Sequence, residues 1–248
     1  MVGRRLVKET LSDKVRDHLK EMIERKEFEP SGQLPSEEVL GEMMGVSRIT
    51  IRDALANLEM DGYVYRRQGK GTFANYRVAK VKHRISSAKE FFALISEKGF
   101  VPSVPYCHYY LGEAGPLVSS KLGCEPKTEI VTIEKLFLAD QLPVIFCLNM
   151  IPAHLVDKQL FQEDLTRPIF KLLRNYSFPK IQYDIVDIIP TVADEKLARL
   201  MSCEQGSPLL LLEATAYDDQ ENPIILFQEY YREGFIRFSE VRTTHYHR

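Results

Sequence analysis

The sequence predicts an α+β protein in two parts: a helical N-terminal part that ends in a β-hairpin, and a C-terminal antiparallel sheet with flanking helices. Three observations predict this arrangement. Residues 10–62 show helical periodicity interrupted by caps and turns, and residues 63–76 alternate as two short strands. From about residue 89 onward, β-rich blocks are separated by turns that contain glycine or proline.

Length and composition allow two cores, because the chain has 248 residues of which 44% are hydrophobic. No run approaches the roughly 18 apolar residues of a membrane helix. The N-terminus, MVGRRLVKET, lacks the apolar run of a signal peptide. We therefore expect a soluble, cytoplasmic protein with no membrane partner. The four cysteines form no CxxC pair and have no histidine at zinc spacing, so neither a metal site nor a cofactor is expected.

Charge is unevenly distributed along the chain. Residues 1–80 contain 15 Lys and Arg against 13 Asp and Glu, whereas the remainder contains 18 against 22. Residues 62–80 contain five basic residues and no acidic one. This segment is therefore a local positive surface on a chain whose net charge is −2.

The first two helices are predicted by their caps. Residues 10–13, TLSD, have the form of a capping box and open a helical pattern through about Lys26. Its apolar positions recur at steps of three and four: Leu11, Val15, Leu19, Met22 and Ile23. After a turn with Pro30 and Gly32, Ser36 can cap a second, short helix that ends near Gly45.

The third helix begins after Ser47, its predicted N-cap, and ends at Gly62. Arg48 and Arg52, four residues apart, lie along one edge of it. The opposite arc is apolar and faces the first two helices: Ile51, Ala54, Leu55 and Leu58. The next residues, YVYRRQGKGTFANY, read as two strands about a Gly69-Lys70-Gly71 turn. Residues 1–76 are thus predicted to form a winged helix-turn-helix domain.

These features indicate DNA binding. The major groove of B-DNA is about 12 Å wide and accepts one helix, whose first turn reaches the base edges. Arginines separated by four residues are ordinary on a solvated helix face, and a glycine-flanked basic turn is ordinary in a polar hairpin. Their occurrence together, in this order after LPSEE, favours DNA binding over an ordinary solvated surface. The predicted DNA-binding residues are Ser36, Ser47, Arg48, Thr50, Arg52, Arg66, Arg67, Gln68, Gly69, Lys70 and Gly71.

Residues 8–76 resemble the DNA-binding domain of the GntR family of bacterial transcription regulators. The resemblance rests on LPSEE, on VSRITIRDALANL and on RRQGKGTF. It implies that Arg48, Thr50 and Arg52 contact the operator and that the glycine-flanked turn is the wing. The chain has Glu38 where the family often has arginine, which removes the basis for a phosphate contact from the second helix.

A linker is predicted at residues 77–88, which are polar and basic without amphipathic period. The second domain, residues 89–248, would begin with a short helix through Lys98. Its predicted β blocks are 101–111, 129–151, 181–190 and a hairpin at 208–232, with a helix at 194–202.

This second domain resembles the UTRA effector-binding domain of the HutC-type branch of the same family, whose fold is similar to that of chorismate lyase. The resemblance rests on ISSAKEFF, EKLFLADQLPV, AYDDQENPI and YYREGFIRF. It implies a homodimer that binds a small metabolite in this domain and changes its affinity for double-stranded operator DNA in response.

The resemblance also places the effector site. Members that bind sugar phosphates hold the phosphate with an early serine, two arginines on one strand, and a serine and a tyrosine on the next. In this chain, Ser86 or Ser87 corresponds to the early serine. Lys135 and Phe137 stand in place of the two arginines, and Leu148 and Met150 in place of the later serine and tyrosine. Four of the five anchors are altered, three of them to apolar residues. A phosphosugar is therefore less expected than another effector.

Strand alternation puts Lys135 among Val131, Ile133 and Phe137. A desolvated ammonium needs a counter-charge, which a bound anion could supply. Alternatively, Lys135 reaches the sheet edge or pairs with a protein carboxylate. Our hypothesis is an effector with one acidic group, met by Lys135 and Arg232, and an apolar part that contacts Phe137, Leu148 and Met150.

The sequence thus predicts an effector-controlled transcription regulator, by family expectation a repressor. An effector-independent architectural DNA-binding protein is an alternative. So is an enzyme related to chorismate lyase, but none of the six histidines lies in a recognisable catalytic arrangement, so no catalytic residue is predicted.

Overall fold

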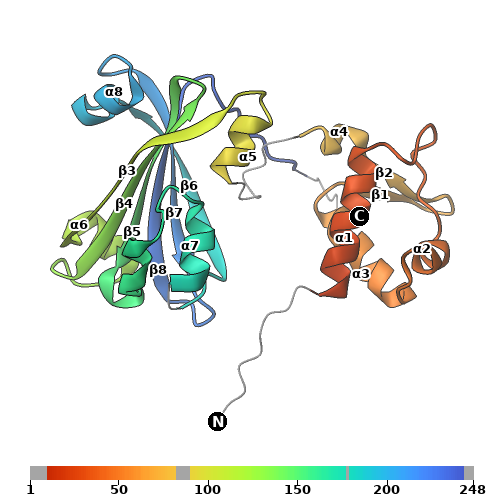
Figure 1. Ribbon diagram of the computed structural model, residues 1–248. Helices are drawn as coiled ribbons and strands as arrows, with labels where there is room; N and C mark the ends of the chain where they lie inside the picture. The colour runs from red at the N-terminus through yellow and green to blue at the C-terminus, as the bar shows by residue number, and fades with distance from the viewer. Residues whose placement is uncertain (1–9, 82–89, 177–178, 243–248) are drawn as a thin grey trace, which may run out of the picture. The chain divides into compact units, whose positions relative to one another are not determined.

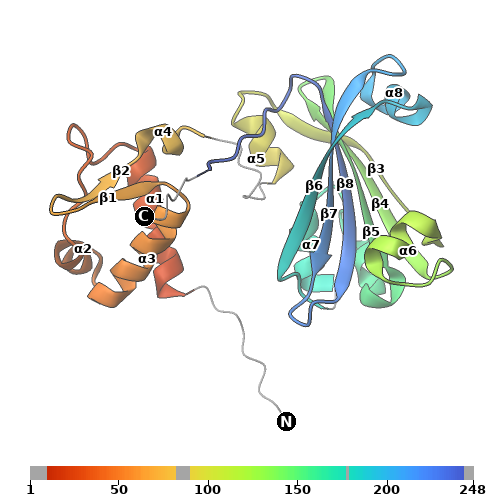
Figure 2. The ribbon, with the colours of Figure 1, turned by 180° about the vertical axis from the view of Figure 1, so that it is seen from behind.

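The computed structural model describes residues 10–81, 90–176 and 179–242. The chain folds into two compact units (Figures 1 and 2). Unit 1 comprises Met1–Ala88 with Phe238–Arg248, and unit 2 comprises Lys89–Arg237. Each unit has its own core and is described by itself.

The described part of unit 1 begins with the helices α1 (Leu11–Glu24), α2 (Glu37–Met44) and α3 (Arg48–Met60). Each begins at the predicted cap. Thr10 and Asp13 form the capping box of α1, and the hydroxyls of Ser36 and Ser47 accept hydrogen bonds from backbone N–H groups in the first turn of α2 and α3. These bonds satisfy donors that a helix N-terminus otherwise leaves unpaired, which is why each helix begins at that residue.

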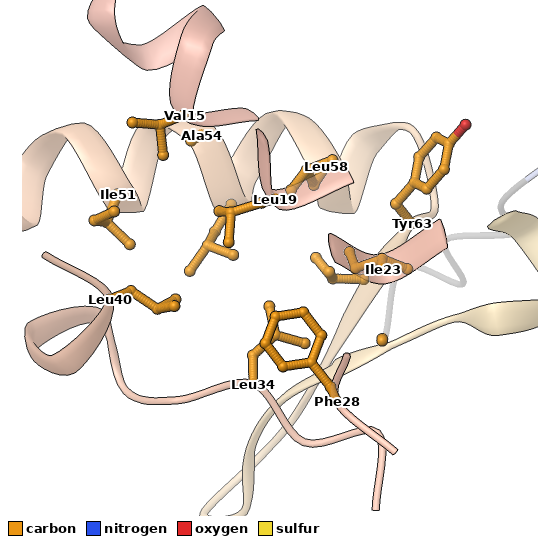
Figure 3. Close-up of a cluster of buried hydrophobic side chains, with 13 residues drawn as sticks. Val15, Leu19, Ile23, Phe28, Leu34, Leu40, Ile51, Ala54, Leu58 and Tyr63 are labelled. Carbon is orange, nitrogen blue, oxygen red and sulfur yellow. The ribbon is translucent and has the colours of Figure 1, made fainter. Parts of the chain in front are cut away.

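The core of unit 1 forms where the three helices meet (Figure 3). Leu19, Ile23, Leu40, Ile51 and Leu58 are fully buried there. The apolar arc predicted for α3 therefore faces inward, and the opposite edge of α3 faces solvent.

A hairpin and a short helix complete unit 1. Strands β1 (Val64–Arg67) and β2 (Gly71–Ala74) pair antiparallel, and α4 (Tyr76–Ala79) follows. Tyr76, Val78 and Ala79 pack against the core of unit 1. The first residues of the segment predicted as a linker, 77–88, are thus helical and packed; residues 82–88 lie outside the part of the chain that the structure describes.

Unit 2 is built on a six-stranded antiparallel sheet of order β3-β4-β5-β8-β7-β6. The hairpins β4–β5 and β7–β8 lie side by side, because β5 pairs with β8. The strands are β3 (Pro102–Glu113), β4 (Glu129–Ala139), β5 (Leu142–Pro152), β6 (Tyr183–Val192), β7 (Pro208–Tyr217) and β8 (Pro223–Arg232).

Helices cover both faces of this sheet (Figures 1 and 2). What we call the α8 face carries α6 (Gly115–Leu122) and α8 (Glu195–Met201), which pack on residues such as Ile130 and Leu136. What we call the α7 face carries α5 (Phe91–Ser96), the 3-10 helices η1 (Ala153–Leu155) and η2 (Lys158–Gln162), and α7 (Ile169–Tyr176). No helix among the described residues is long and apolar enough to cross a membrane.

A β-bulge in the β4–β5 hairpin decides which residues share a face. The register shifts between Phe137 and Leu138, so Lys135 lies opposite Cys147, and Glu134 lies opposite Leu148. Paired residues of an antiparallel ladder project to the same side. Lys135 and Cys147 therefore belong to the α7 face, and Leu148 belongs to the α8 face.

Candidate DNA interface and effector site

The outer edge of α3 presents two arginines held by one carboxylate. Glu37, the first residue of α2, accepts hydrogen bonds at Oε2 from Arg48 Nε at 3.2 Å and from Arg52 Nε and Nη2 at 3.3 and 3.1 Å. The arginine side chains remain 65% and 55% exposed, whereas that of Glu37 is 22% exposed. The guanidinium groups therefore lie on the surface, as a helix that enters a DNA groove requires.

The hydrogen bonds from Arg52 and Arg48 lower the pKa of Glu37 despite its partial burial. A carboxylate that accepts charge-assisted bonds stays ionised at neutral pH. Its negative charge offsets the repulsion between the two cations, which are spaced four residues apart on one helix.

The hydroxyl groups predicted to contact DNA are already bonded within the helix N-termini. Ser36 Oγ accepts from Val39 N at 3.3 Å, and Ser47 Oγ accepts from Thr50 N at 3.2 Å. Ser47 Oγ and Thr50 Oγ1 lie 2.8 Å apart in a further hydrogen bond. These side chains therefore fix where α2 and α3 begin, and thereby position Glu37 and Arg48.

The wing is tied down at its tip by a residue that the sequence patterns did not reveal. Gln33 Nε2 donates to the Lys70 carbonyl oxygen at 2.8 Å. Gly69 and Gly71 have φ of +71° and +102°, and a Cβ on Gly71 would come within 3.2 Å of Gln33 Nε2. Both glycines are thus required by the backbone of the turn. Gln68 and Lys70 are exposed beside them.

The three cations of the wing differ in what they contact. Arg66 pairs with Glu59 at 3.3 Å. The guanidinium of Arg67 lies over the rings of Tyr65 and Phe73, 5.2 and 4.9 Å from their centroids. Lys70 takes part in none of the ion pairs found among the described residues. Among the described residues, the side chain of Lys70 therefore has neither the ion pair of Arg66 nor the ring contacts of Arg67.

In unit 2, Lys135 is buried in the α7 face. It is 1% exposed, and Nζ donates to the carbonyl oxygen of Arg167 at 2.6 Å. It therefore does not reach the sheet edge, and within the described part of the chain it forms no salt bridge. Burial lowers the pKa of Lys135. Beside it, Phe137 packs edge-on against Phe91 and Phe92 of α5.

Comparison with known families decides the identity. The model of the UTRA domain matches residues 97–234, and that of the bacterial regulatory proteins of the gntR family matches residues 11–74. The chain belongs to the GntR family and carries a UTRA domain. It is therefore a DNA-binding transcription regulator of the effector-responsive type.

Similar proteins align with most of this GntR-family chain. The HTH-type transcriptional repressor NagR of Bacillus subtilis is 28% identical over 203 residues, 82% of each chain. The probable fructoselysine utilization operon transcriptional repressor of Escherichia coli is 25% identical over 212 residues, 85% of each chain. Among solved structures, YydK of Bacillus subtilis has a TM-score of 0.70 at 17% identity, covering 94% of this chain and 99% of its own. That likeness supports the fold.

The structure brings together only part of the apolar wall expected beside Lys135 in this GntR-family regulator. Phe137 lies on the α7 face with Lys135, but Leu148 and Met150 lie on the α8 face, where they pack near α6. The bulge is the physical reason. Without it, the register of Ala139 with Leu142 would continue and would place Leu148 opposite Ile133.

The structure does not bring Arg232 beside Lys135, because Arg232 pairs with Leu209 and so falls on the α8 face. Its guanidinium donates to the carbonyl oxygens of Pro143 at 2.8 Å, Ser202 at 3.1 Å and Met201. Met201 and Ser202 end α8, so Arg232 satisfies carbonyl groups that the helix C-terminus leaves unpaired. Ser86 and Ser87 lie outside the described residues.

Glu229 is a second ionisable residue of the α7 face, and it was not among the residues predicted from the sequence. Cys147 pairs with Lys135 on one side and with Glu229 on the other, so the three form one row across three strands. Tyr231 Oη donates to Glu229 at 2.5 Å. Burial raises the pKa of Glu229 to about 7. The alternating pattern of β8 could have revealed it, because Glu229 falls between Phe227 and Tyr231.

Proposed function

We propose that this GntR-family protein binds its operator through α3 and the wing. Arg48 and Arg52 contact base edges in the major groove, and Lys70 contacts phosphate. The observation that carries the proposal is the exposed guanidinium pair on the edge of α3 opposite its buried arc. Arginine can donate two hydrogen bonds to guanine O6 and N7, which discriminates between base pairs. Glu38, exposed on α2, contributes no phosphate contact.

The effector site in this proposal is the α7 face around Lys135 and Phe137. A buried ammonium with a single backbone acceptor gains a counter-charge when an anion binds. The rings of Phe91, Phe92 and Phe137 supply apolar contacts. The effector is therefore a molecule with one acidic group and an apolar part, with Ser86 or Ser87 as a further contact.

A titration tests the effector class. Purified full-length protein would be titrated with phosphosugars and with apolar carboxylates by calorimetry. A carboxylate should bind to wild type and lose most of its affinity for Lys135→Ala. Tight binding of a phosphosugar that Lys135→Ala leaves unchanged would contradict the assignment.

We further propose a homodimer of the HutC type that acts in the cytoplasm as a repressor. A dimer supplies two DNA-binding domains, one for each of two half-sites that lie on the same side of the duplex, about 34 Å or a multiple apart. The edge strand β6 supports this, because Ile185, Ile188 and Val192 are each more than half exposed. An antiparallel strand edge can pair with its own copy about a twofold axis. Light scattering tests this: Ile188→Lys should convert dimers to monomers.

Regulation in this proposal is a population shift. The effector binds one arrangement of the dimer more tightly and so increases its population. The two DNA-binding domains thereby change position relative to the half-sites. Operator affinity should therefore change with effector concentration. Unchanged affinity across a broad metabolite panel would favour the effector-independent alternative. We assign no catalytic role to unit 2; its relatives are named as regulators.

A further inference from the structure

Glu37 is the only acidic side chain that bonds both arginines of α3 in the described structure. Its Oε2 atom lies 3.2 Å from Arg48 Nε and 3.1 Å from Arg52 Nη2. The carboxylate sits on α2, and the arginines sit on α3. The contact therefore joins the two helices of the helix-turn-helix at the surface that would meet DNA.

The bonds leave particular donors free. A guanidinium has five N–H groups, and guanine O6 and N7 are paired by two of them lying side by side. Glu37 occupies the Nε edge of Arg48 and the Nε–Nη2 edge of Arg52. The terminal edge of each guanidinium, formed by Nη1 and the outer hydrogen of Nη2, stays available for a base.

The same bonds reduce the charge that DNA meets. Two arginines alone present two positive charges to any phosphate, whatever the sequence. With an ionised Glu37 between them, the trio carries one net positive charge. The hydrogen bonds from Arg52 and Arg48 lower the pKa of Glu37, so the carboxylate keeps this charge at neutral pH.

We infer that Glu37 is a positioning residue that sets sequence specificity. It holds the inner edges of Arg48 and Arg52 so that their terminal edges face the bases, and its charge weakens binding to random phosphate backbones. Glu37 itself makes no contact with the bases. The inference rests on the proposed placement of both arginines in the major groove.

The test uses full-length protein, an operator duplex selected from a random library, and a duplex of scrambled sequence. Dissociation constants for both duplexes would be measured over a range of salt concentrations. Glu37→Gln keeps the side-chain shape and removes the charge. We expect tighter binding to scrambled DNA, a salt dependence steeper by about 0.9 as for one further phosphate contact, and a specificity ratio about tenfold lower.

Glu38→Gln is the matched control. Glu38 is the exposed neighbour of Glu37 and forms no ion pair with the other residues that the structure describes. This variant also removes one negative charge, so it should strengthen binding to both duplexes alike and leave the specificity ratio unchanged. Equal specificity ratios for Glu37→Gln and Glu38→Gln would overturn the inference.

Glu37→Asp separates position from charge. Its carboxylate is one methylene shorter, so it cannot reach both guanidinium groups in the same geometry. We expect a lower specificity ratio with the salt dependence of wild type; an unchanged ratio would contradict the positioning role. If Arg48→Ala and Arg52→Ala leave specificity intact, the proposed DNA contacts fail instead, which distinguishes the two failures.

Discussion

Lys135 donates its hydrogen bond to the backbone carbonyl of Arg167, at 2.6 Å, and not to a carboxylate of the described structure. The bond links β4 to the loop before α7. Among the described residues the ammonium is thus buried without an ion-pair partner, so we expect it to contribute little to the stability of the fold and to pair with an anionic ligand.

Lys135→Met tests this directly. Methionine has a similar length and no charge. It removes the cost of burying an ammonium but leaves the Arg167 carbonyl without this donor, and because the two effects oppose each other the free energy of unfolding should stay within about 1 kcal/mol of wild type. Lys135→Ala leaves a void and should cost about 2 to 5 kcal/mol. Chemical denaturation measures both. If Lys135→Met is as destabilised as Lys135→Ala, the ammonium has a structural role.

Arg232→Ala should destabilise unit 2, because three carbonyl oxygens lose their donor. The bonds to Pro143 and Met201 are part-buried, and a buried acceptor left unpaired costs about 1 to 3 kcal/mol, whereas water can replace the exposed bond to Ser202. Arg199→Ala, at an exposed position of α8, is the control and should stay within about 0.5 kcal/mol of wild type. Thermal unfolding followed by circular dichroism measures both variants. A stable Arg232→Ala that no longer binds effector would contradict this structural role and support the predicted contact of Arg232 with the effector.

The carboxyl of Glu229 predicts a pH effect on stability. Its folded pKa is about 7, against an ordinary value of 4.5. Between these values the folded state keeps a proton that the unfolded state has released, so this group's contribution to stability falls as pH rises from about 4.5 to 7. The loss is about 3 kcal/mol, because one pKa unit corresponds to about 1.4 kcal/mol.

Glu229→Gln has no carboxyl group to titrate at this position. The free energy of unfolding of wild type minus that of the variant should therefore fall as pH rises from about 4.5 to 7. The comparison is needed because Asp184 also has a raised pKa, from burial. Tyr231 and Cys147 titrate well above the window, since burial raises the pKa of both. A difference between wild type and variant that stays constant with pH would contradict the prediction.

Lys70→Ala should weaken binding to every DNA sequence. Lys70 forms no ion pair with another described residue, so it can contact phosphate without first breaking one. Removing one phosphate contact should reduce the salt slope by about 1. Lys158→Ala, exposed in η2, is the control and should change neither quantity. A loss confined to the selected operator would show that Lys70 reads sequence.

The helix-turn-helix could be predicted because its determinants are local. Thr10, Ser36 and Ser47 cap the helix that follows each of them, and such bonds depend on residues three positions apart. The strand blocks of unit 2 were predicted correctly for the same reason. Helices α6 and α7 were not predicted. Helix α6 is as short as α2, but no side chain caps it, so it lacks the local signal that marked α2.

The effector site could be predicted only in part, because the face on which a strand residue lies depends on pairing. One extra residue on β5, Val144, lies opposite the step from Phe137 to Leu138 and moves Leu148 and Met150 to the other side of the sheet. Nothing in the local sequence specifies that bulge. The contact of Glu37 with Arg48 and Arg52 is likewise non-local, spanning 11 and 15 residues.

The specificity ratio of Arg52→Ala tests the central claim most directly. The affinity of the full-length protein for a selected operator would be divided by its affinity for scrambled DNA at one fixed salt concentration. If α3 reads the major groove, Arg52→Ala should lower this ratio at least about tenfold. An unchanged ratio, with both duplexes weakened equally, would show that Arg52 binds only phosphate and would contradict the account.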